Sequence, residues 1–239
     1  MNDAKIIKRA VLLAAGRGTR LQPYTDTTPK PLLVHKGKPT LDYLLESLLE
    51  AGVDDVVLVT HHLHEQVQSY ASAWMASHSQ QLRCVYQPHL FGTAHALQTV
   101  IDQTPDIVEH SFVLSATDYL LPREFFSNLI EFHASHDAPL SVSMKQLDAR
   151  EMAGRSSIRF GQDRSITEIV EKPAEGTAPS DIGANLTFVL PAELMPYVEN
   201  VPMSQRGEHE VQQAINEWLK QGGVAQGLLQ PTPMEWRAP

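Results

Sequence analysis

The sequence predicts an α/β protein built on a mostly parallel sheet with helices on both faces. Short apolar runs alternate with apolar patterns of helical spacing from about residue 8 to residue 147. Residues 8–15 form the first run, and residues 40–52 carry leucines three and four positions apart before a glycine. Such alternation joins parallel strands through right-handed crossovers. Ligands bind sheets of this kind beyond the carboxyl ends of the strands.

The remaining elements follow from the same local patterns. Apolar runs predict strands at residues 54–60, 82–86, 111–118 and 139–147. Helical spacing predicts helices at residues 64–77, 93–103 and 122–136. After residue 148 we expect two short strands within 156–172, a strand at 182–190 and a helix at 208–221. This second half is predicted to be mixed, partly antiparallel and packed onto the first.

Composition limits the classes of partner. The 239 residues, 42% hydrophobic and 20% charged, fit one large domain or two small ones with a substantial core, and we expect a single domain, 1–239. A net charge of −9 argues against nucleic-acid binding, which needs a basic face. The single cysteine, Cys84, excludes an internal disulfide and suits a cytoplasmic protein. No apolar run approaches the roughly 20 residues that a membrane span needs, so we expect no membrane association.

Glycines and cations follow the first expected strand, within residues 13–33. Small residues there let backbone N–H groups approach a bulky anion. Arg17, Arg20 and Lys30 would neutralise it, arginine through forked contacts and lysine as a point charge. The pattern lacks the third glycine of the dinucleotide fingerprint and the G-K-[ST] of a Walker A loop. It therefore predicts a phosphate site of another kind.

The pattern G-x-G-T-R-L-x-P-x-T followed by P-K-P-L resembles the signature of the sugar-1-phosphate nucleotidyltransferases, which include glucose-1-phosphate thymidylyltransferase and N-acetylmuramate-1-phosphate uridylyltransferase. The resemblance covers nearly the whole chain. It implies a Rossmann-like nucleotide-diphospho-sugar transferase fold, with a nucleotide-binding part (1–147) and an acceptor-binding part (148–239). It also implies that Arg20 and Lys30 bind the phosphates of a nucleoside triphosphate. The implied nucleotide-binding residues are Leu13, Ala14, Ala15, Gly16, Arg17, Gly18, Thr19, Gln87, Gly92 and Thr93.

Residues 86–97 resemble the base-reading segment of the same family. The resemblance implies that Gln87 pairs with the edge of a uracil or thymine and that Gly92 donates its backbone N–H. An amide donates and accepts at once, which suits a pyrimidine that carries carbonyls. The structural alternative is a loop leading into a helix capped by Thr93, and this cap is compatible with a binding role.

Further site residues follow the strands of both halves. The resemblance implies that Asp118 binds Mg²⁺, an ion that prefers carboxylate and phosphate oxygens, and the alternative is a helix N-cap. Thr117 stands where the family usually has glycine. The V-E-K-P stretch implies that Glu171 binds sugar hydroxyls and Lys172 the sugar phosphate, although such a tripeptide also forms ordinary charged turns. Asn185 is a further expected acceptor contact.

Two departures from the family pattern bear on the acceptor and the metal. Ser156 and Ser157 stand where family members commonly carry tyrosine and glycine, which leaves an unusual acceptor open. Family members commonly end with tryptophan, one residue and a metal-binding aspartate. Here the nearby carboxylate is Glu235, which precedes Trp236. Either Glu235 replaces that aspartate as a metal ligand, or the ligand is absent.

The predicted reaction transfers a nucleotidyl group from UTP or dTTP to a sugar 1-phosphate, with direct in-line attack and Mg²⁺. Arg20, Lys30, Asp118 and Lys172 are the expected catalytic residues, which position the substrates and neutralise charge. One alternative is a non-sugar acceptor, such as phosphocholine, a phosphonate or a cyclitol phosphate, with CTP or GTP as donor. Another is an inactive nucleotide-sugar sensor or regulatory subunit. The sequence leaves association into a homo-oligomer open.

Overall fold

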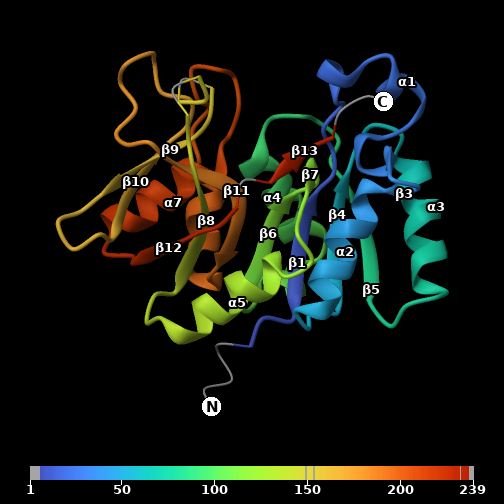
Figure 1. Cartoon of the computed structure of the whole chain (residues 1–239). Coiled ribbons are helices and arrows are strands. Elements are labelled where there is room, and N and C mark those ends of the chain that lie inside the picture. Colours follow the sequence, from blue (N-terminus) through green and yellow to red (C-terminus); the bar gives the residue numbers. More distant parts are fainter. Residues whose placement is uncertain (1–5, 149, 153, 232, 237–239) are drawn as a thin grey trace.

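A seven-stranded sheet runs through the centre of the computed structural model, which describes residues 6–148, 150–152, 154–231 and 233–236 (Figure 1). The strand order is β12-β8-β11-β6-β1-β4-β5. Strand β11 runs antiparallel to its neighbours β6 and β8, and the other pairings are parallel. The predicted α/β class and mostly parallel sheet are thus confirmed. The strands are β1 (Arg9–Leu13), β4 (Asp55–Thr60), β5 (Gln81–Tyr86), β6 (Phe112–Ala116), β8 (Leu140–Gln146), β11 (Ile182–Leu190) and β12 (Ala225–Leu229).

Different helices cover the two faces of the sheet, because successive strand side chains point to opposite faces. Ala10 and Leu12 of β1 belong to the core that α2, α3 and α5 cover, and Val11 belongs to the core under α4 and α7. All three side chains are fully buried, as expected for a parallel strand between two helical layers. The helices are α2 (Thr40–Glu50), α3 (His64–Met75), α4 (Thr93–Gln103), α5 (Phe125–Ser135) and α7 (Val211–Lys220).

Strand register brings the predicted site segments to one edge of the sheet. Leu13, at the end of β1, lies beside Val59 of β4 and Ala116 of β6. The chain leaves β1 into the glycine-rich stretch and leaves β6 toward Asp118. Gln87 directly follows β5. All these segments therefore emerge at the carboxyl edge of the sheet, where ligands of parallel sheets bind.

The second half of the chain adds strands to the central sheet and a separate hairpin. The predicted strands within 156–172 form the antiparallel pair β9 (Ser157–Phe160) and β10 (Ile166–Val170), and β10 packs against α7. Strand β12, which the sequence patterns did not predict, pairs with β8 at the edge of the sheet. The remaining short strands and α-helices are β2 (Val34–His35), β3 (Lys38–Pro39), β7 (Tyr119–Leu120), β13 (Met234–Glu235), α1 (Tyr24–Thr27) and α6 (Met195–Val198).

None of the helices in the described ranges combines the length and the apolar character that crossing a bilayer requires.

Candidate active site

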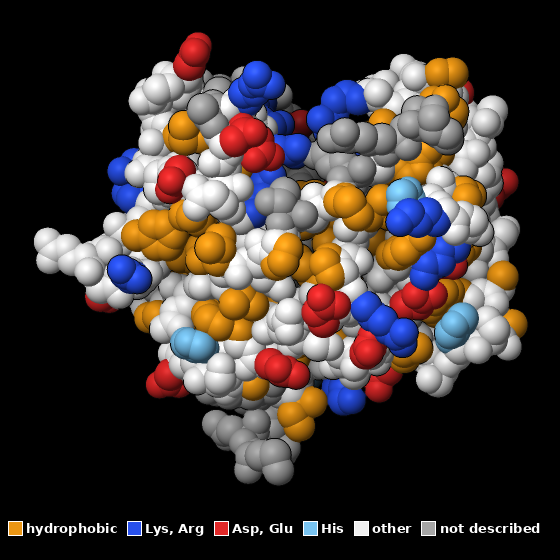
Figure 2. Space-filling view, viewed as in Figure 1, with side chains coloured by type: hydrophobic (Ala, Val, Ile, Leu, Met, Phe, Trp, Pro, Cys, Tyr) orange, Lys and Arg blue, Asp and Glu red, His pale blue; other side chains and the backbone are white. Residues whose placement is uncertain are grey.

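Two adjoining cavities open at the carboxyl edge of the sheet. The smaller, of about 260 Å³, lies between the glycine-rich stretch and the connection from β5 to α4. The larger, of about 970 Å³, extends toward the second half of the chain. Figure 2 shows a hollow at the top of the molecule with lysine and arginine side chains on both sides of it. The two cavities share the lining residues Thr93, Asp118, Leu186 and Glu208.

The glycine-rich stretch supplies one wall of this site. The backbone N–H of Ala14 donates to the Val59 carbonyl at 2.8 Å, so this amide is committed to the sheet rather than to a ligand. The exposed Arg17 is not among the lining residues of either cavity. Gly18 is not among them either. The predicted contacts from this stretch that do line the cavities are Leu13, Ala15 and Gly16 in the smaller and Thr19 and Arg20 in the larger.

Gly18 lets the stretch pack against the stem of Lys30. Its φ is +65°, and an added Cβ would lie 2.9 Å from Thr25 Cγ2 and 3.3 Å from Lys30 Cβ. The Thr25 hydroxyl donates to the Gly18 carbonyl at 2.9 Å. Glycine adopts this left-handed conformation without steric cost. The tight turn therefore fixes the base of the Lys30 side chain beside the cavity.

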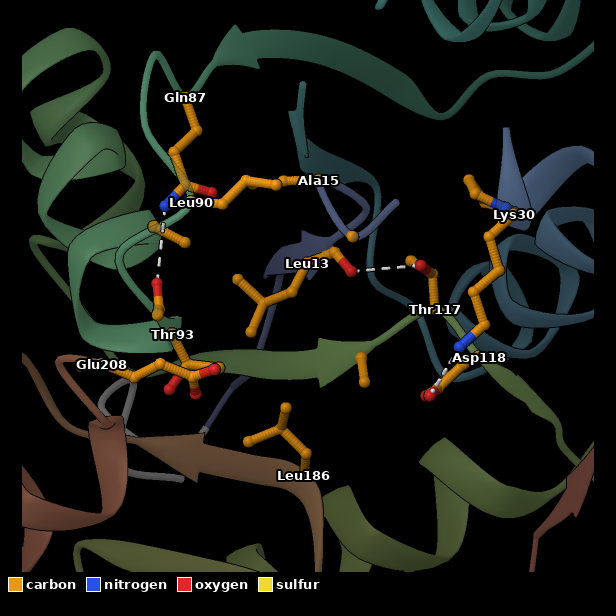
Figure 3. A pocket seen from close by; sticks show the side chains of 15 residues that line it. Leu13, Ala15, Lys30, Gln87, Leu90, Thr93, Thr117, Asp118, Leu186 and Glu208 are labelled. Carbon is orange, nitrogen blue, oxygen red and sulfur yellow. Dashed lines mark hydrogen bonds and ion pairs between the residues drawn. The ribbon is translucent and has the colours of Figure 1, made fainter. Parts of the chain in front are cut away.

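Lys30 and Asp118 form an ion pair at the centre of the site, with 2.9 Å between Nζ and Oδ2 (Figure 3). Both side chains are partly buried, at 19% and 27% exposed. The other carboxylate oxygen, Asp118 Oδ1, is buried and has no hydrogen-bond partner among the described residues. Asp118 precedes the short strand β7, so the alternative of a helix N-cap is wrong. The sequence predicted both residues, and the fold brings them into contact.

Thr117, where the family commonly has glycine, is accommodated by a hydrogen bond between strands. Its hydroxyl donates to the Leu13 carbonyl at 3.1 Å (Figure 3). This bond ties the end of β6 to the end of β1 and leaves Asp118 facing the cavity.

The predicted base-reading residues lie at the far end of the smaller cavity. Gln87 and Gly92 line it, and Gln87 is only 2% exposed. Helix α4 begins at Thr93, and no side-chain hydrogen bond caps it. The Thr93 hydroxyl instead accepts from the Val211 N–H at 2.9 Å, so the predicted cap is wrong. Thr93 therefore ties the start of α4 to the start of α7.

Glu171 is the centre of a polar cluster at the end of the larger cavity that the second half of the chain forms. The Ser156 hydroxyl donates a short hydrogen bond to Glu171 Oε2, and Gln212 Nε2 donates to the same oxygen at 3.0 Å. Lys172 is about half exposed, and its Nζ lies 4.0 Å from Glu171 Oε1. Ser156, which departs from the family pattern, thus orients the predicted sugar-binding carboxylate.

An arginine that the sequence did not single out completes this cluster. Arg206 lies 3.5 Å from Glu171 Oε1, 2.9 Å from Glu208 Oε2 and 2.8 Å from Glu210 Oε1. Burial raises the pKa of Glu210 above its usual range; the Arg206 charge opposes this shift, and the Glu171 charge adds to it. The charged run R-G-E-H-E before an amphipathic helix was the sequence signal that could have indicated Arg206. Its partner in the cluster, Glu171, is distant in sequence, so the run alone did not reveal the ion pair.

The structure does not bring Asn185 to either cavity. Its side chain is 2% exposed, and its Nδ2 donates to Ser143 Oγ at 3.0 Å. The neighbouring residues on β11, Ala184 and Leu186, line the larger cavity instead.

The donor set at Asp118 fits a hard divalent cation. Mg²⁺ binds one or two carboxylates and completes its shell with phosphate and water oxygens, and Asp118 offers an unpartnered buried oxygen beside the cavity. The described residues contain no group of three or more potential metal ligands, so a metal here would need the substrate's oxygens. The backbone of Glu235 pairs with that of Tyr119, next to Asp118. The side chain of Glu235, the other predicted ligand, lies outside the described part of the structure.

Fold and site together define an α/β protein with a glycine-rich loop beside its cavities, a buried amide at one end and a carboxylate–cation cluster at the other. Residues 9–236 match the nucleotidyl transferase family, and the chain belongs to that family.

Curated relatives of similar sequence carry related names. The low-salt glycan biosynthesis nucleotidyltransferase Agl11 of Haloferax volcanii is 28% identical, over 90% of this chain and 58% of its own length. The UTP–glucose-1-phosphate uridylyltransferase AglF of the same organism is 28% identical, over 90% of this chain and 84% of its own length. The chain spans about half the length of other relatives, such as 47% of the bifunctional protein GlmU of Methanococcus maripaludis.

Solved structures share the fold. A UDP-glucose pyrophosphorylase complexed with UDP-glucose superimposes with a TM-score of 0.81 at 22% identity, over 92% of this chain and 89% of that chain. At this identity the likeness establishes the architecture alone.

Proposed function

We propose that this chain transfers a nucleotidyl group from a nucleoside triphosphate, UTP or dTTP by preference, to a sugar 1-phosphate and releases pyrophosphate. The observation that carries the proposal is the pair of adjoining cavities with Asp118 in their shared wall. Lys30 lies on the side of the glycine-rich stretch, and Glu171 and Lys172 lie on the other side. Family membership and the names of the relatives support the same reaction class.

In this proposal the base lies against Gln87 and Gly92, and the triphosphate runs along the glycine-rich stretch. Arg20 and Lys30 neutralise its charge, and Lys172 holds the acceptor phosphate. An oxygen of that phosphate attacks the α-phosphorus in line, and pyrophosphate leaves. The protein contributes mainly positioning and charge neutralisation, since phosphoryl-type transfers need little covalent chemistry from it.

Mg²⁺ is proposed as the cofactor, held by Asp118 and by Glu235. When bound, such an ion neutralises phosphate oxygens and orients them. Lys30 occupies one oxygen of Asp118 at 2.9 Å, which leaves the buried Oδ1 as the free donor.

The larger cavity favours a hydroxylated acceptor over a choline phosphate. Tyr119 is the one aromatic residue among the described residues that line it, whereas quaternary ammonium groups are bound by cages of several aromatic rings. Glu171 and Gln212 supply the acceptors and donors that sugar hydroxyls need. Lys30, Asp118 and Lys172 are all present, which supports an active enzyme over a sensor. Consumption of a nucleoside triphosphate and the single cysteine support a cytoplasmic location.

A matrix of nucleoside triphosphates against phosphorylated acceptors, read by pyrophosphate release, tests the proposal. UTP or dTTP with a hexose 1-phosphate should give the highest turnover. Release of pyrophosphate with phosphocholine or a phosphonate, and with none of the sugar phosphates, would contradict the acceptor class. Absence of release with every pair would contradict the enzymatic function itself. The Lys30→Ala variant is the control for contaminating activity.

A further inference from the structure

The amide of Gln87 is held in one orientation by two acceptors. Its Nε2 lies 2.8 Å from His95 Nδ1 and 3.4 Å from the Gly92 carbonyl oxygen. A carbonyl only accepts, so the atom that faces Gly92 must be the N–H₂ end of the amide. Both amide protons are then used within the protein, and none of the hydrogen bonds among the described residues reaches Gln87 Oε1. Figure 3 shows this oxygen pointing into the smaller cavity.

His95, in the first turn of α4, is the acceptor that defines this orientation. Because Gln87 donates, His95 Nδ1 must be unprotonated, and a neutral imidazole then carries its proton on Nε2. The ring also makes a hydrogen bond to the His89 backbone, and the edge-to-face ring of Phe91 lies 5.4 Å away. These contacts hold the imidazole plane against the Gln87 amide.

We propose that His95 is a positioning residue that sets the base preference of the nucleotide site by turning the carbonyl of Gln87 toward the base. Uracil and thymine carry an N3–H, which this carbonyl accepts. Cytosine carries a lone pair at N3, which the same carbonyl repels. The inference rests on the proposed function, because it takes the smaller cavity as the base site. It adds a residue that does not touch the base and a physical reason for excluding CTP.

Protonation of His95 would reverse the arrangement. A charged imidazole donates from both nitrogens, so Gln87 would have to turn its carbonyl toward His95 and its N–H₂ toward the base. Burial lowers the pKa of His95 most, and charge on His209 and His89 lowers it further, while Asp102 and the His89 backbone oppose these effects. The uracil preference is therefore present at neutral pH. It is lost as the pH falls through a pKa below the usual imidazole value.

Three variants separate this role from a structural one. His95→Ala removes the acceptor and frees the amide to turn. His95→Asn retains an acceptor oxygen near the position of Nδ1 but cannot ionise. His110→Ala removes an exposed histidine that precedes β6, at the opposite end of that strand, and serves as the control. Calorimetric titration gives the Kd of UTP and of CTP for each full-length protein from about pH 8 to about pH 5.5. The ratio of the two constants cancels the titration of the triphosphate, which both ligands share.

The wild type should prefer UTP at neutral pH and lose that preference as the pH falls. His95→Ala should lower the UTP-over-CTP ratio by roughly five- to a hundredfold at neutral pH, the effect of one buried hydrogen bond. His95→Asn should keep the neutral-pH ratio and abolish its pH dependence. An unchanged ratio in a folded His95→Ala protein, or equal pH dependence in His95→Asn and wild type, overturns the proposal.

Binding and turnover distinguish a failure of this inference from a failure of the proposed function. If pyrophosphate is released with UTP and a sugar phosphate, but the ratio of the UTP and CTP dissociation constants is the same in wild type and the His95 variants, only the positioning role is wrong. If the wild type binds CTP as well as UTP, the orientation assigned to Gln87 is wrong, whatever the reaction. If neither nucleotide binds, the nucleotide site and the inference are wrong together.

Discussion

Gly92→Ala is the substitution whose effect the structure specifies most closely. Gly92 has a φ of +106° and a ψ of −177°, a backbone region that essentially only glycine occupies. An added Cβ would lie 2.8 Å from the His209 nitrogen, 3.0 Å from its carbonyl carbon and closer still to its carbonyl oxygen. The His209 backbone cannot retreat freely, because its N–H donates to Phe91 at 2.7 Å and its carbonyl accepts from Ala94 at 2.8 Å.

The expected loss of folding stability in Gly92→Ala has two contributions. The unfavourable backbone conformation costs about 1–3 kcal/mol for a residue with a Cβ. Overpacking against a held backbone adds about 1–3 kcal/mol. Gly92→Ala should therefore lower the free energy of unfolding by about 2–6 kcal/mol. Affinity for UTP should also fall, since the shifted segment carries Gln87 and Thr93 at the cavity.

Gly176→Ala is the matched control. Gly176 has a φ of +75°, and an added Cβ would meet nothing within 4 Å. This variant should show only the conformational cost, about 1–2 kcal/mol, with normal UTP affinity. Urea unfolding of both proteins gives the two losses. Equal losses in the free energy of unfolding would show that the His209 backbone shifts to accommodate the added Cβ. A Gly92→Ala protein with the stability and UTP affinity of wild type would refute the reasoning altogether.

Three further outcomes are expected. Asp118→Asn should lower Mg²⁺ affinity and activity. Glu235→Gln should lower activity less, and high Mg²⁺ or Mn²⁺ should partly restore that activity. A metal titration in which both variants behave like wild type would refute the metal site. Lys172→Ala should weaken acceptor binding by about 10- to 100-fold with little effect on UTP, and calorimetry showing the larger loss for UTP would contradict this. Burial raises the pKa of the Cys84 thiol to about 11. Alkylation of Cys84 near pH 8 should therefore be slow in the folded protein and fast in urea, since the thiolate is the reactive form. Fast labelling of the folded protein would contradict the burial of this thiol.

The fold was predictable because local patterns agree with the packing. The buried runs of β1, β4 and β6 are apolar on both faces, as expected for parallel strands that lie between two layers of helices. Strand β12 (Ala225–Leu229) escaped prediction, since its residues A-Q-G-L-L neither alternate nor favour strands, and pairing with β8 determines it. The two-residue pairs, such as β7 with β13, are too short to show any period.

The site was predictable where one segment carries its own chemistry. Lys30, Gln87 and Asp118 each follow a recognisable local pattern, and the register of the sheet brings them together. Partners distant in sequence, such as Arg206 for Glu171, leave no local signal. The sequence did not show which face of β11 turns toward the cavity. Asn185 lies on the same face as Val189, whereas Ala184 and Leu186 lie on the face that lines the cavity.

The strand order makes the two predicted parts of the chain, 1–147 and 148–239, inseparable as fragments. Strand β8 belongs to the first 147 residues, yet both of its neighbours, β11 and β12, come from the remainder. A polypeptide that stops at residue 147 would leave β8 with no pairing strand and would expose the edge of β6 that β11 covers. Such a half-protein would present open strand edges of the kind that promote aggregation. Gene fusions, split reporters and circular permutations of this protein should therefore place their breaks in surface loops and keep β8, β11 and β12 together.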